Sequence, residues 1–156
     1  MSIAGLKPLR SNPNMRCKHY MLSAPTCVLD TAPLSEALSI MIRKHMQDLM
    51  VVNAQGEFLG TITSFTFSKM LLPATPQLPD ESDRETAEDV DNRLMPHLHR
   101  KVGDFTGAHP VVDAEAPLTE ALNLLAAGYI RLPVVGPENK LVGALSSLTI
   151  LRRFRF

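Results

Sequence analysis

The strongest constraint on the fold of this 156-residue chain is that its sequence repeats itself. A helix-start motif, Ala-Pro-Leu-Ser-Glu-Ala-Leu, returns later in the chain with one change, Ser to Thr, and two apolar stretches return after it in the same order. The matched segments are residues 28–38 with 111–122, 49–52 with 132–135 and 58–66 with 141–149. Because the order and spacing are shared, the chain must be built from two copies of one supersecondary unit.

Each copy of the repeat carries the periodicities of a short unit of mixed helices and strands. A proline, Pro33 or Pro117, stands in the first turn of a predicted helix, where its missing N–H costs little. Apolar residues then recur every three to four positions, which is typical of an amphipathic helix. Two apolar runs separated by turn residues predict a pair of strands, the second containing Gly60 or Gly143. The closing residues return to helical spacing.

With the apolar run ahead of each helix, each copy has the predicted order β-α-β-β-α. A unit this small cannot bury both faces of its sheet by itself. We therefore expect two pseudo-symmetric repeats to pack sheet to sheet into one globule of the α+β class. The expected boundaries are an N-terminal arm over residues 1–19, a first repeat over 20–72, a linker over 73–101 and a second repeat over 102–156.

The linker is rich in proline and acidic residues and holds one predicted helix. Its prolines and acidic residues are Pro73, Pro76, Pro79, Asp80, Glu81, Asp83, Glu85, Glu88, Asp89, Asp91 and Pro96. Thr86 with Asp89 three residues later is typical of a capping box at a helix start, and Pro96 interrupts the helix. This helix is either a solvent-exposed helix on the surface of the protein or a docking site for a partner protein.

Charge and composition argue against several classes of function. The chain has 16 basic and 16 acidic side chains, so it lacks the surplus positive charge with which nucleic-acid binders neutralise phosphates. No apolar run approaches the roughly 20 residues of a membrane helix, and the N-terminus has no apolar core of signal-peptide length. We therefore expect a cytoplasmic protein that binds neither nucleic acid nor membrane, with Cys17 and Cys27 as free thiols.

Neither a metal site nor an active site is predicted. His97 and His99 stand two residues apart and supply at most half of a tetrahedral zinc shell. The sequence has no phosphate-cradling Gly-x-x-x-x-Gly-Lys, no Rossmann glycine fingerprint and no recognisable Ser-His-Asp or Cys-His grouping. We expect a protein without catalytic activity, metal or obligatory cofactor.

Four groups of motifs occur in a fixed order. They are residues 21–25 (Met-Leu-Ser-Ala-Pro), the two helix starts, residues 128–135 (Gly-Tyr-Ile-Arg-Leu-Pro-Val-Val) and two strand ends of the form Gly-x-x-(Thr/Ser). From Tyr20 to the C-terminus, apart from the linker, this set resembles a tandem pair of CBS domains, regulatory modules named after cystathionine beta-synthase. The resemblance implies a stand-alone sensor that binds AMP, ADP, ATP or S-adenosylmethionine in clefts between the repeats. It also implies a homodimer that passes its signal through its own assembly or to a separate protein target.

The resemblance further implies which residues contact the ligand. In the family pattern Gly-x-x-(Thr/Ser)-x-x-Asp, the hydroxyl lies near phosphate or ribose and the aspartate accepts hydrogen bonds from the ribose diol. In this chain the hydroxyls are Thr63 and Ser146, and the aspartate positions hold Thr66 and Thr149. A threonine accepts such a hydrogen bond without the negative charge that roughly doubles its strength.

The second copy carries the better-equipped site. Arg131 stands where the family often places a cation that faces phosphate, whereas the first copy aligns Asp48 there. The loops that lead into each repeat correspond to the family loop whose backbone commonly holds the adenine edge. The implied ligand contacts are Arg131, Ser146, Thr149, His109, Pro110, Thr26, Thr63 and Thr66.

These residues also have structural interpretations. A Ser or Thr after a buried strand often caps the next helix, and Arg131 can pair with Glu138 at the surface. Two hypotheses therefore stay open. The chain is either a ligand-responsive regulatory module, or a structural dimerisation or partner-docking module that has lost nucleotide binding, as the missing aspartates suggest.

Overall fold

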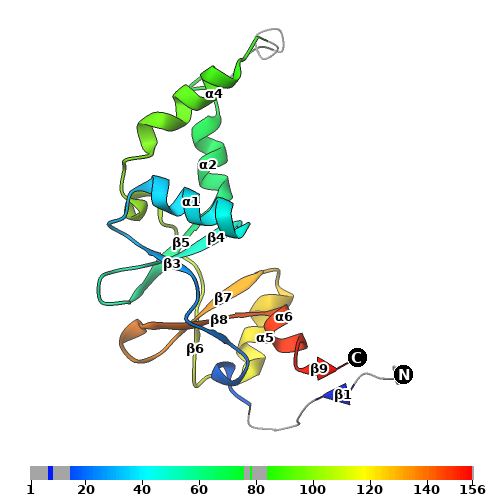
Figure 1. Cartoon of the computed structure of the whole chain (residues 1–156). Coiled ribbons are helices and arrows are strands. Elements are labelled where there is room, and N and C mark those ends of the chain that lie inside the picture. Colours follow the sequence, from blue (N-terminus) through cyan, green and yellow to red (C-terminus); the bar gives the residue numbers. More distant parts are fainter. Residues whose placement is uncertain (1–6, 9–14, 76–77, 79–83, 156) are drawn as a thin grey trace. The chain divides into compact units, whose positions relative to one another are not determined.

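The chain divides into two units in the computed structural model, which describes residues 7–8, 15–75, 78 and 84–155 (Figure 1). The first-repeat unit comprises Cys27–Ala54 and Leu59–Ala108, and the second-repeat unit comprises Met1–Thr26, Gln55–Phe58 and His109–Phe156. The segment that ends at Thr26 leads into the first repeat but belongs to the second-repeat unit, and the segment that ends at Ala108 leads into the second repeat but belongs to the first-repeat unit. These two stretches are called the lead-in segments.

The first repeat folds in the order that its sequence predicts. Its elements are β3 (Cys27–Leu29), α1 (Leu34–Lys44), β4 (Asp48–Val52), β5 (Phe58–Thr63) and α2 (Ser64–Leu71). The sheet order is β3-β4-β5, and β3 runs parallel to β4 with Val28 opposite Val51. Helix α1 buries Leu34, Ala37 and Met41, whose spacing of three and four residues places them on one face. They share a core with the apolar side chains of the sheet.

The linker belongs to the first-repeat unit and contains the predicted helix. Its elements are α4 (Ala87–Leu94) and the 3-10 turn η2 (Met95–His97), and the 3-10 turn η3 (Val102–Phe105) follows it in the same unit. The capping box is confirmed, because Thr86 Oγ1 accepts from the Asp89 N–H at 3.2 Å and the Asp89 carboxylate accepts from the Thr86 N–H at 2.9 Å. These hydrogen bonds hold the pKa of the Asp89 carboxyl below its ordinary value. The predicted features at Pro76, Pro79, Asp80, Glu81 and Asp83 lie outside the described residues.

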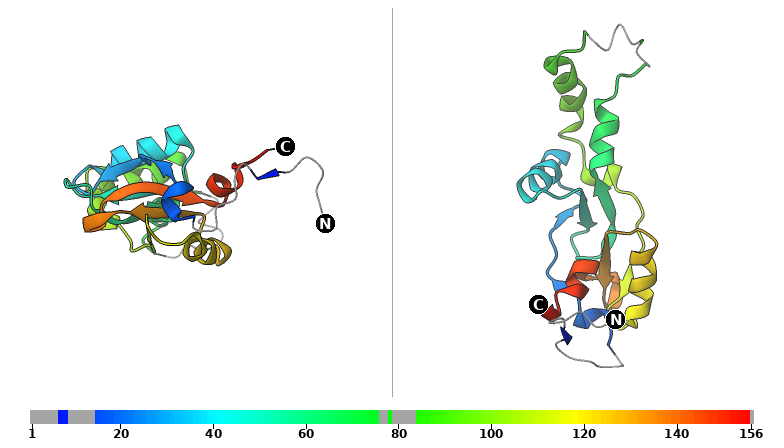
Figure 2. Two further views of the ribbon diagram at one scale, coloured as in Figure 1. Left: turned by 90° about the horizontal axis from the view of Figure 1, so that it is seen from below. Right: turned by 90° about the vertical axis from the view of Figure 1, so that its right-hand side faces the viewer.

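Helix α4 lies alongside α2 (Figure 2). Its Arg93 Nε donates a hydrogen bond of 2.7 Å to the Leu71 carbonyl, and its guanidinium pairs with Glu85. Leu94 packs against the core of the unit, while most other residues of α4 are exposed. The last turn of α4 therefore attaches the helix to the first-repeat unit, while most of the rest of the helix is exposed to solvent.

The second repeat folds in the same order. Its elements are β6 (Val112–Asp113), α5 (Leu118–Ala126), β7 (Arg131–Val135), β8 (Leu141–Ser146) and α6 (Ser147–Leu151), joined by β2 (Leu22–Ser23) in a sheet of order β2-β8-β7-β6. Strand β6 is parallel to β7, and β7 is antiparallel to β8 with Leu132 opposite Leu145. Shorter elements are η1 (Cys17–His19), η4 (Pro137–Asn139) and the paired strands β1 (Lys7–Pro8) and β9 (Phe154–Arg155). The α+β class and the duplicated order are confirmed, and the packing of one sheet on the other stays a prediction.

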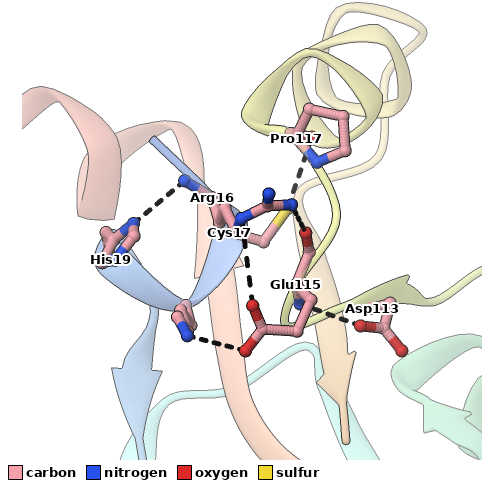
Figure 3. Close-up of polar contacts among 7 residues, drawn as sticks. Arg16, Cys17, His19, Asp113, Glu115 and Pro117 are labelled. Atoms are coloured by element: carbon pink, nitrogen blue, oxygen red, sulfur yellow. Dashed lines mark hydrogen bonds and ion pairs between the residues drawn. The ribbon is translucent and has the colours of Figure 1, made fainter. Parts of the chain in front are cut away.

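The N-terminal lead-in segment docks on the loop ahead of α5 (Figure 3). The N–H groups of Cys17 and Lys18 donate to the carbonyls of Ala116 and Ala114 at 2.9 and 3.0 Å. The Lys18 ammonium also pairs with Glu115 at 2.6 Å. These contacts place the Cys17 side chain in the core of the second-repeat unit, at a position for which the sequence predicts an arm outside the repeats.

The glycine at the third position of each repeat's last strand permits a lead-in segment to approach closely. A Cβ on Gly60 would lie 2.2 Å from the Gly107 carbonyl oxygen, and a Cβ on Gly143 would lie 2.4 Å from Met21 Sδ. In the first-repeat unit, Thr61 and Gly107 exchange two backbone hydrogen bonds of 2.9 Å. Both glycines are therefore close-packing positions.

The close approach at Gly60 generates a stability prediction. Gly60→Ala forces a methyl group against the Gly107 carbonyl, so we expect the free energy of unfolding to fall by about 3 kcal/mol. Gly56→Ala is the matched control, because Gly56 also has a positive φ of 80° but a Cβ there meets nothing within 4 Å. It should cost about 1 kcal/mol. Urea unfolding followed by circular dichroism measures both variants, and equal losses would contradict the packing role of Gly60.

Candidate functional site

Two of the implied ligand contacts are neighbours in the second-repeat unit. Arg131 is the first residue of β7 and Ser146 the last residue of β8, and the antiparallel register places them opposite each other. Both line a pocket of about 360 Å³. The other lining residues are Leu125, Gly128, Tyr129, Ile130, Ser147 and Leu148. This size lies within the range of about 300–1,000 Å³ that is typical of small-molecule sites.

The pocket combines apolar and polar groups. Its apolar side chains include Ile130 and Leu148, which are 82% and 75% exposed although most of the repeat's other apolar side chains pack into its core. Its polar side chains are Arg131, the two serines Ser146 and Ser147, and Tyr129 with its phenol hydroxyl. The arrangement suits a ligand with a flat apolar part and an anionic part, because an apolar surface binds the first and a forked guanidinium binds the second.

The lead-in loop of the second repeat reaches this pocket through an aromatic contact. The rings of His109 and Tyr129 meet edge to face, with centroids 5.4 Å apart and planes at 69°. His109 Nδ1 lies 2.8 Å from the Pro110 carbonyl oxygen, which fixes the ring on its own loop. His109 therefore supports a pocket residue, and neither His109 nor Pro110 is itself among the lining residues. Thr26 is half-buried in the same unit and does not line the pocket either.

Thr149 forms hydrogen bonds with Ser146, the N-cap residue of helix α6. Its Oγ1 accepts from the Ser146 N–H at 2.9 Å and donates to the Ser146 carbonyl at 2.9 Å, while Ser146 Oγ accepts from the Thr149 N–H at 3.3 Å. The helix-capping interpretation of these two hydroxyls is therefore confirmed. Thr149 also lines a different pocket, of about 380 Å³, together with His19, Tyr20 and Arg152. The structure thus separates Thr149 from the pocket of Arg131.

Of the two candidates in the first repeat, only Thr66 lines one of the described pockets. Thr63 stands at the N-cap position of α2 without a side-chain cap hydrogen bond, and it is half-buried. Thr66, one turn into α2, lines a third pocket that includes residues of the linker. Asp48 begins β4, at the place that corresponds to Arg131 in the second repeat. The first repeat therefore has no counterpart of the cationic pocket around Arg131.

The thiols and histidines of the described residues form no reactive centre. Burial raises the pKa of the Cys17 thiol, and partial desolvation raises that of the Cys27 thiol although Cys27 is exposed, so neither is an activated nucleophile at neutral pH. Where the structure describes the chain, no three His, Cys, Asp or Glu side chains gather closely enough to hold a metal ion. None of the helices in those parts is long and apolar enough to span a bilayer.

Sequence reasoning missed the apolar side chains of the pocket. Tyr129 and Ile130 belong to the motif that carries the family resemblance, yet neither was singled out as a ligand contact. Their position in the sequence could have identified them, because they stand between the end of α5 and Arg131, the cation at the start of β7. Gly128, with a φ of 113°, turns the chain there and leaves both side chains outside the core.

Comparison with known proteins identifies the family. The profile of the CBS domain matches residues 17–72 and 102–155. The chain therefore belongs to the CBS-domain family, with one domain for each repeat. No curated protein is similar enough in sequence to count as a match.

Solved structures share this fold at low sequence identity. CBSX2 from Arabidopsis thaliana, in a structure with AMP, is 20% identical, with a TM-score of 0.64 over 88% of this chain and 93% of that one. CbpB in complex with c-di-AMP is 15% identical, with a TM-score of 0.66 over 89% and 83%. A CBS domain-containing protein from Kribbella flavida is 18% identical, with a TM-score of 0.70 over 88% and 97%. These likenesses show the fold of a tandem CBS pair.

The capping role of Ser146 can be tested by stability. Ser146→Ala removes the hydroxyl that accepts from the Thr149 N–H, and we expect it to cost about 1 kcal/mol. Ser147→Ala is the control, because Ser147 is exposed in the first turn of the same helix and its loss should stay within about 0.5 kcal/mol. Urea unfolding of both variants measures the difference. A loss at Ser146 no larger than at Ser147 would contradict the capping role.

Proposed function

We propose that the chain is a regulatory module that binds an adenosine-containing ligand in the pocket of the second-repeat unit. The observation that carries this proposal is the presence of Arg131, two serine hydroxyls and exposed apolar side chains in one pocket. An adenine ring matches the apolar side chains and a phosphate matches the guanidinium. CBS-pair proteins of the same fold have been solved with AMP and with c-di-AMP, which supports nucleotide binding as the general role.

The polar groups favour ligands that carry phosphate. Among AMP, ADP, ATP and S-adenosylmethionine, the three nucleotides offer a phosphate to Arg131, whereas S-adenosylmethionine offers only the single carboxylate of its methionine part and carries a sulfonium in place of phosphate. The ribose diol has a weaker partner than in the family pattern, since the Thr149 hydroxyl is occupied by two hydrogen bonds within its helix start. We therefore expect modest affinity, between micromolar and millimolar.

The same pocket supports a regulatory role over a catalytic one. Its hydroxyls would need a neighbouring general base to act as nucleophiles. None of its lining residues, all of which are described, is a histidine, cysteine, aspartate or glutamate. We propose a sensor that transmits binding through the geometry of a homodimer or to a separate protein target.

A second candidate function is structural dimerisation without a ligand. Phe65 in α2 and Leu148 in α6 occupy equivalent positions in the two repeats and are 73% and 75% exposed. Exposed apolar side chains that recur at the same place on duplicated helices favour a self-complementary contact with a second copy of the chain. This contact serves either function, so ligand binding decides between them.

Calorimetric titration of AMP, ADP, ATP and S-adenosylmethionine tests the binding proposal. Arg131→Ala should weaken the three nucleotides about tenfold, because it removes a charged hydrogen-bond donor worth about 1.5–3 kcal/mol. It should weaken any binding of S-adenosylmethionine less, because that ligand has a single carboxylate in place of phosphate. Arg152→Ala is the matched control, because it removes the same charge from the pocket that contains Thr149.

Each result has a defined meaning. A larger loss of nucleotide affinity with Arg152→Ala than with Arg131→Ala would place the nucleotide in the pocket of Thr149 and would contradict this proposal. Flat titrations with all four ligands at millimolar concentration would contradict the sensor and leave the structural module.

The assembly proposal is tested by light scattering coupled to gel filtration. At tens of micromolar we expect a species of twice the chain mass, and the double variant Phe65→Ser, Leu148→Ser should shift it toward the monomer, since it removes the apolar contact from both helices. Met95→Ser is the control, because Met95 is 61% exposed but lies in the linker. A single monomeric species of the unmodified chain would contradict the homodimer.

A further inference from the structure

A further pocket lies in the first-repeat unit, between α2 and the linker. Its volume is about 810 Å³. Its lining residues are Thr66, Lys69, Met70, Leu72, Pro73, Ala74, Asn92, Arg93, Pro96, His97 and Phe105. Six of them come from the linker, which is outside both repeats: Pro73, Ala74, Asn92, Arg93, Pro96 and His97. The pocket is therefore not a product of the duplicated CBS architecture and has no equivalent around Arg131.

The walls of this linker pocket are fixed by contacts within the unit. Arg93 joins the end of α2 through its 2.7 Å hydrogen bond to the Leu71 carbonyl. The Phe105 ring meets the His97 ring edge to face at 6.3 Å, and the Arg100 guanidinium lies 4.7 Å from the Phe105 ring centroid. The cavity is thus formed before a ligand arrives, which lowers the entropy cost of binding.

The charge of the linker pocket is positive. None of its lining residues, all of them described, carries a carboxylate. The Arg93 charge is compensated by its ion pair with Glu85. Lys69 is exposed in the last turn of α2 and forms no ion pair with a described residue. One ammonium that has no ion pair among the described residues favours a singly charged anion at the pocket.

The remaining lining residues define the rest of the ligand. Met70, Leu72, Pro96 and Phe105 offer apolar contacts to an uncharged body. His97 adds a polar atom, because its Nδ1 is buried and has no hydrogen-bond partner among the described residues. A ligand that reaches this nitrogen would satisfy a group whose isolation is costly.

We propose that the linker pocket is a second binding site, for a small organic carboxylate with an aliphatic or aromatic body. The Lys69 ammonium binds the carboxylate, and the apolar side chains contact the body. A nucleotide is a poorer match, because its phosphate carries more charge than one flexible ammonium balances and the forked guanidinium of Arg93 is already engaged. The site is independent of nucleotide binding around Arg131.

The test uses octanoate, octanol and acetate as probes of the full chain, at concentrations below micelle formation. Octanol has the apolar body without the charge, and acetate has the charge without the body. Octanoate should bind at least tenfold more tightly than either, by calorimetry and by amide chemical shifts in the NMR spectrum, because only octanoate engages both parts of the pocket. The shifts should centre on Thr66, Met70 and Phe105.

Three variants locate the site. Lys69→Gln should weaken octanoate at least threefold, and Ala74→Trp, which fills the pocket from an exposed loop position, should weaken it at least tenfold. Arg43→Gln should bind like the unmodified chain, because it also removes a cation from the last turn of a helix of the same unit but lies outside the pocket. These variants should leave AMP titrations unchanged.

Other outcomes would overturn the proposal. Equal affinities for octanol and octanoate would mean a merely apolar surface. Equal losses in Lys69→Gln and Arg43→Gln would mean a general charge effect, and shifts centred on the residues around Arg131 would place the carboxylate in the other pocket.

Discussion

The contact on which both units depend is the backbone pairing between a lead-in segment and the last strand of a repeat. Thr61 and Gly107 exchange two hydrogen bonds in the first-repeat unit, and β2 extends β8 in the second-repeat unit. Each contact covers a strand edge that would otherwise present unpaired N–H and C=O groups. The segments come close because the last strands carry Gly60 and Gly143, and a side chain at either position would collide with the incoming chain. A duplicated sequence thus produces two units that are each completed by residues from outside their own repeat.

The sequence predicts the regular elements well and these completing contacts poorly. The order β-α-β-β-α follows from apolar spacing, because a helix such as α1 must place Leu34, Ala37 and Met41 on one buried face. The capping box at Thr86 was also predictable, since it depends on two side chains three residues apart. The docking of Cys17 was not, because it rests on backbone hydrogen bonds from Cys17 and Lys18 that any residue except proline could donate. Backbone pairing can be recognised in the sequence only where the close approach of two segments requires a glycine, as at Gly60 and Gly143.

The candidate site shows a similar division. The family resemblance points to Arg131 and Ser146, and the strand register places them in one pocket because they are the first and last residues of adjacent antiparallel strands. The motif spacing does not determine which pocket a side chain lines. Thr149 and Thr66 match the family pattern, yet they line two other pockets. Tyr129 and Ile130 were missed for a different reason. Apolar residues in a sequence are ordinarily assigned to the core, and only the structure shows that these two lie at a surface pocket.

Thr149 completes a helix start at the position where the family pattern has an aspartate. A carboxylate at the third position of a helix can accept the N–H of the N-cap residue, as Asp89 does in α4. Thr149 performs this role in α6 and in addition donates its hydroxyl proton to the Ser146 carbonyl, which an ionised carboxylate cannot do. The helix start is therefore satisfied without a negative charge, and the hydroxyl has little capacity left for a ribose. Any recognition of an adenosine ligand in this repeat must then rest on Arg131, the serine hydroxyls and the apolar side chains of their pocket, which recognise phosphate and base but provide no charged acceptor for the sugar.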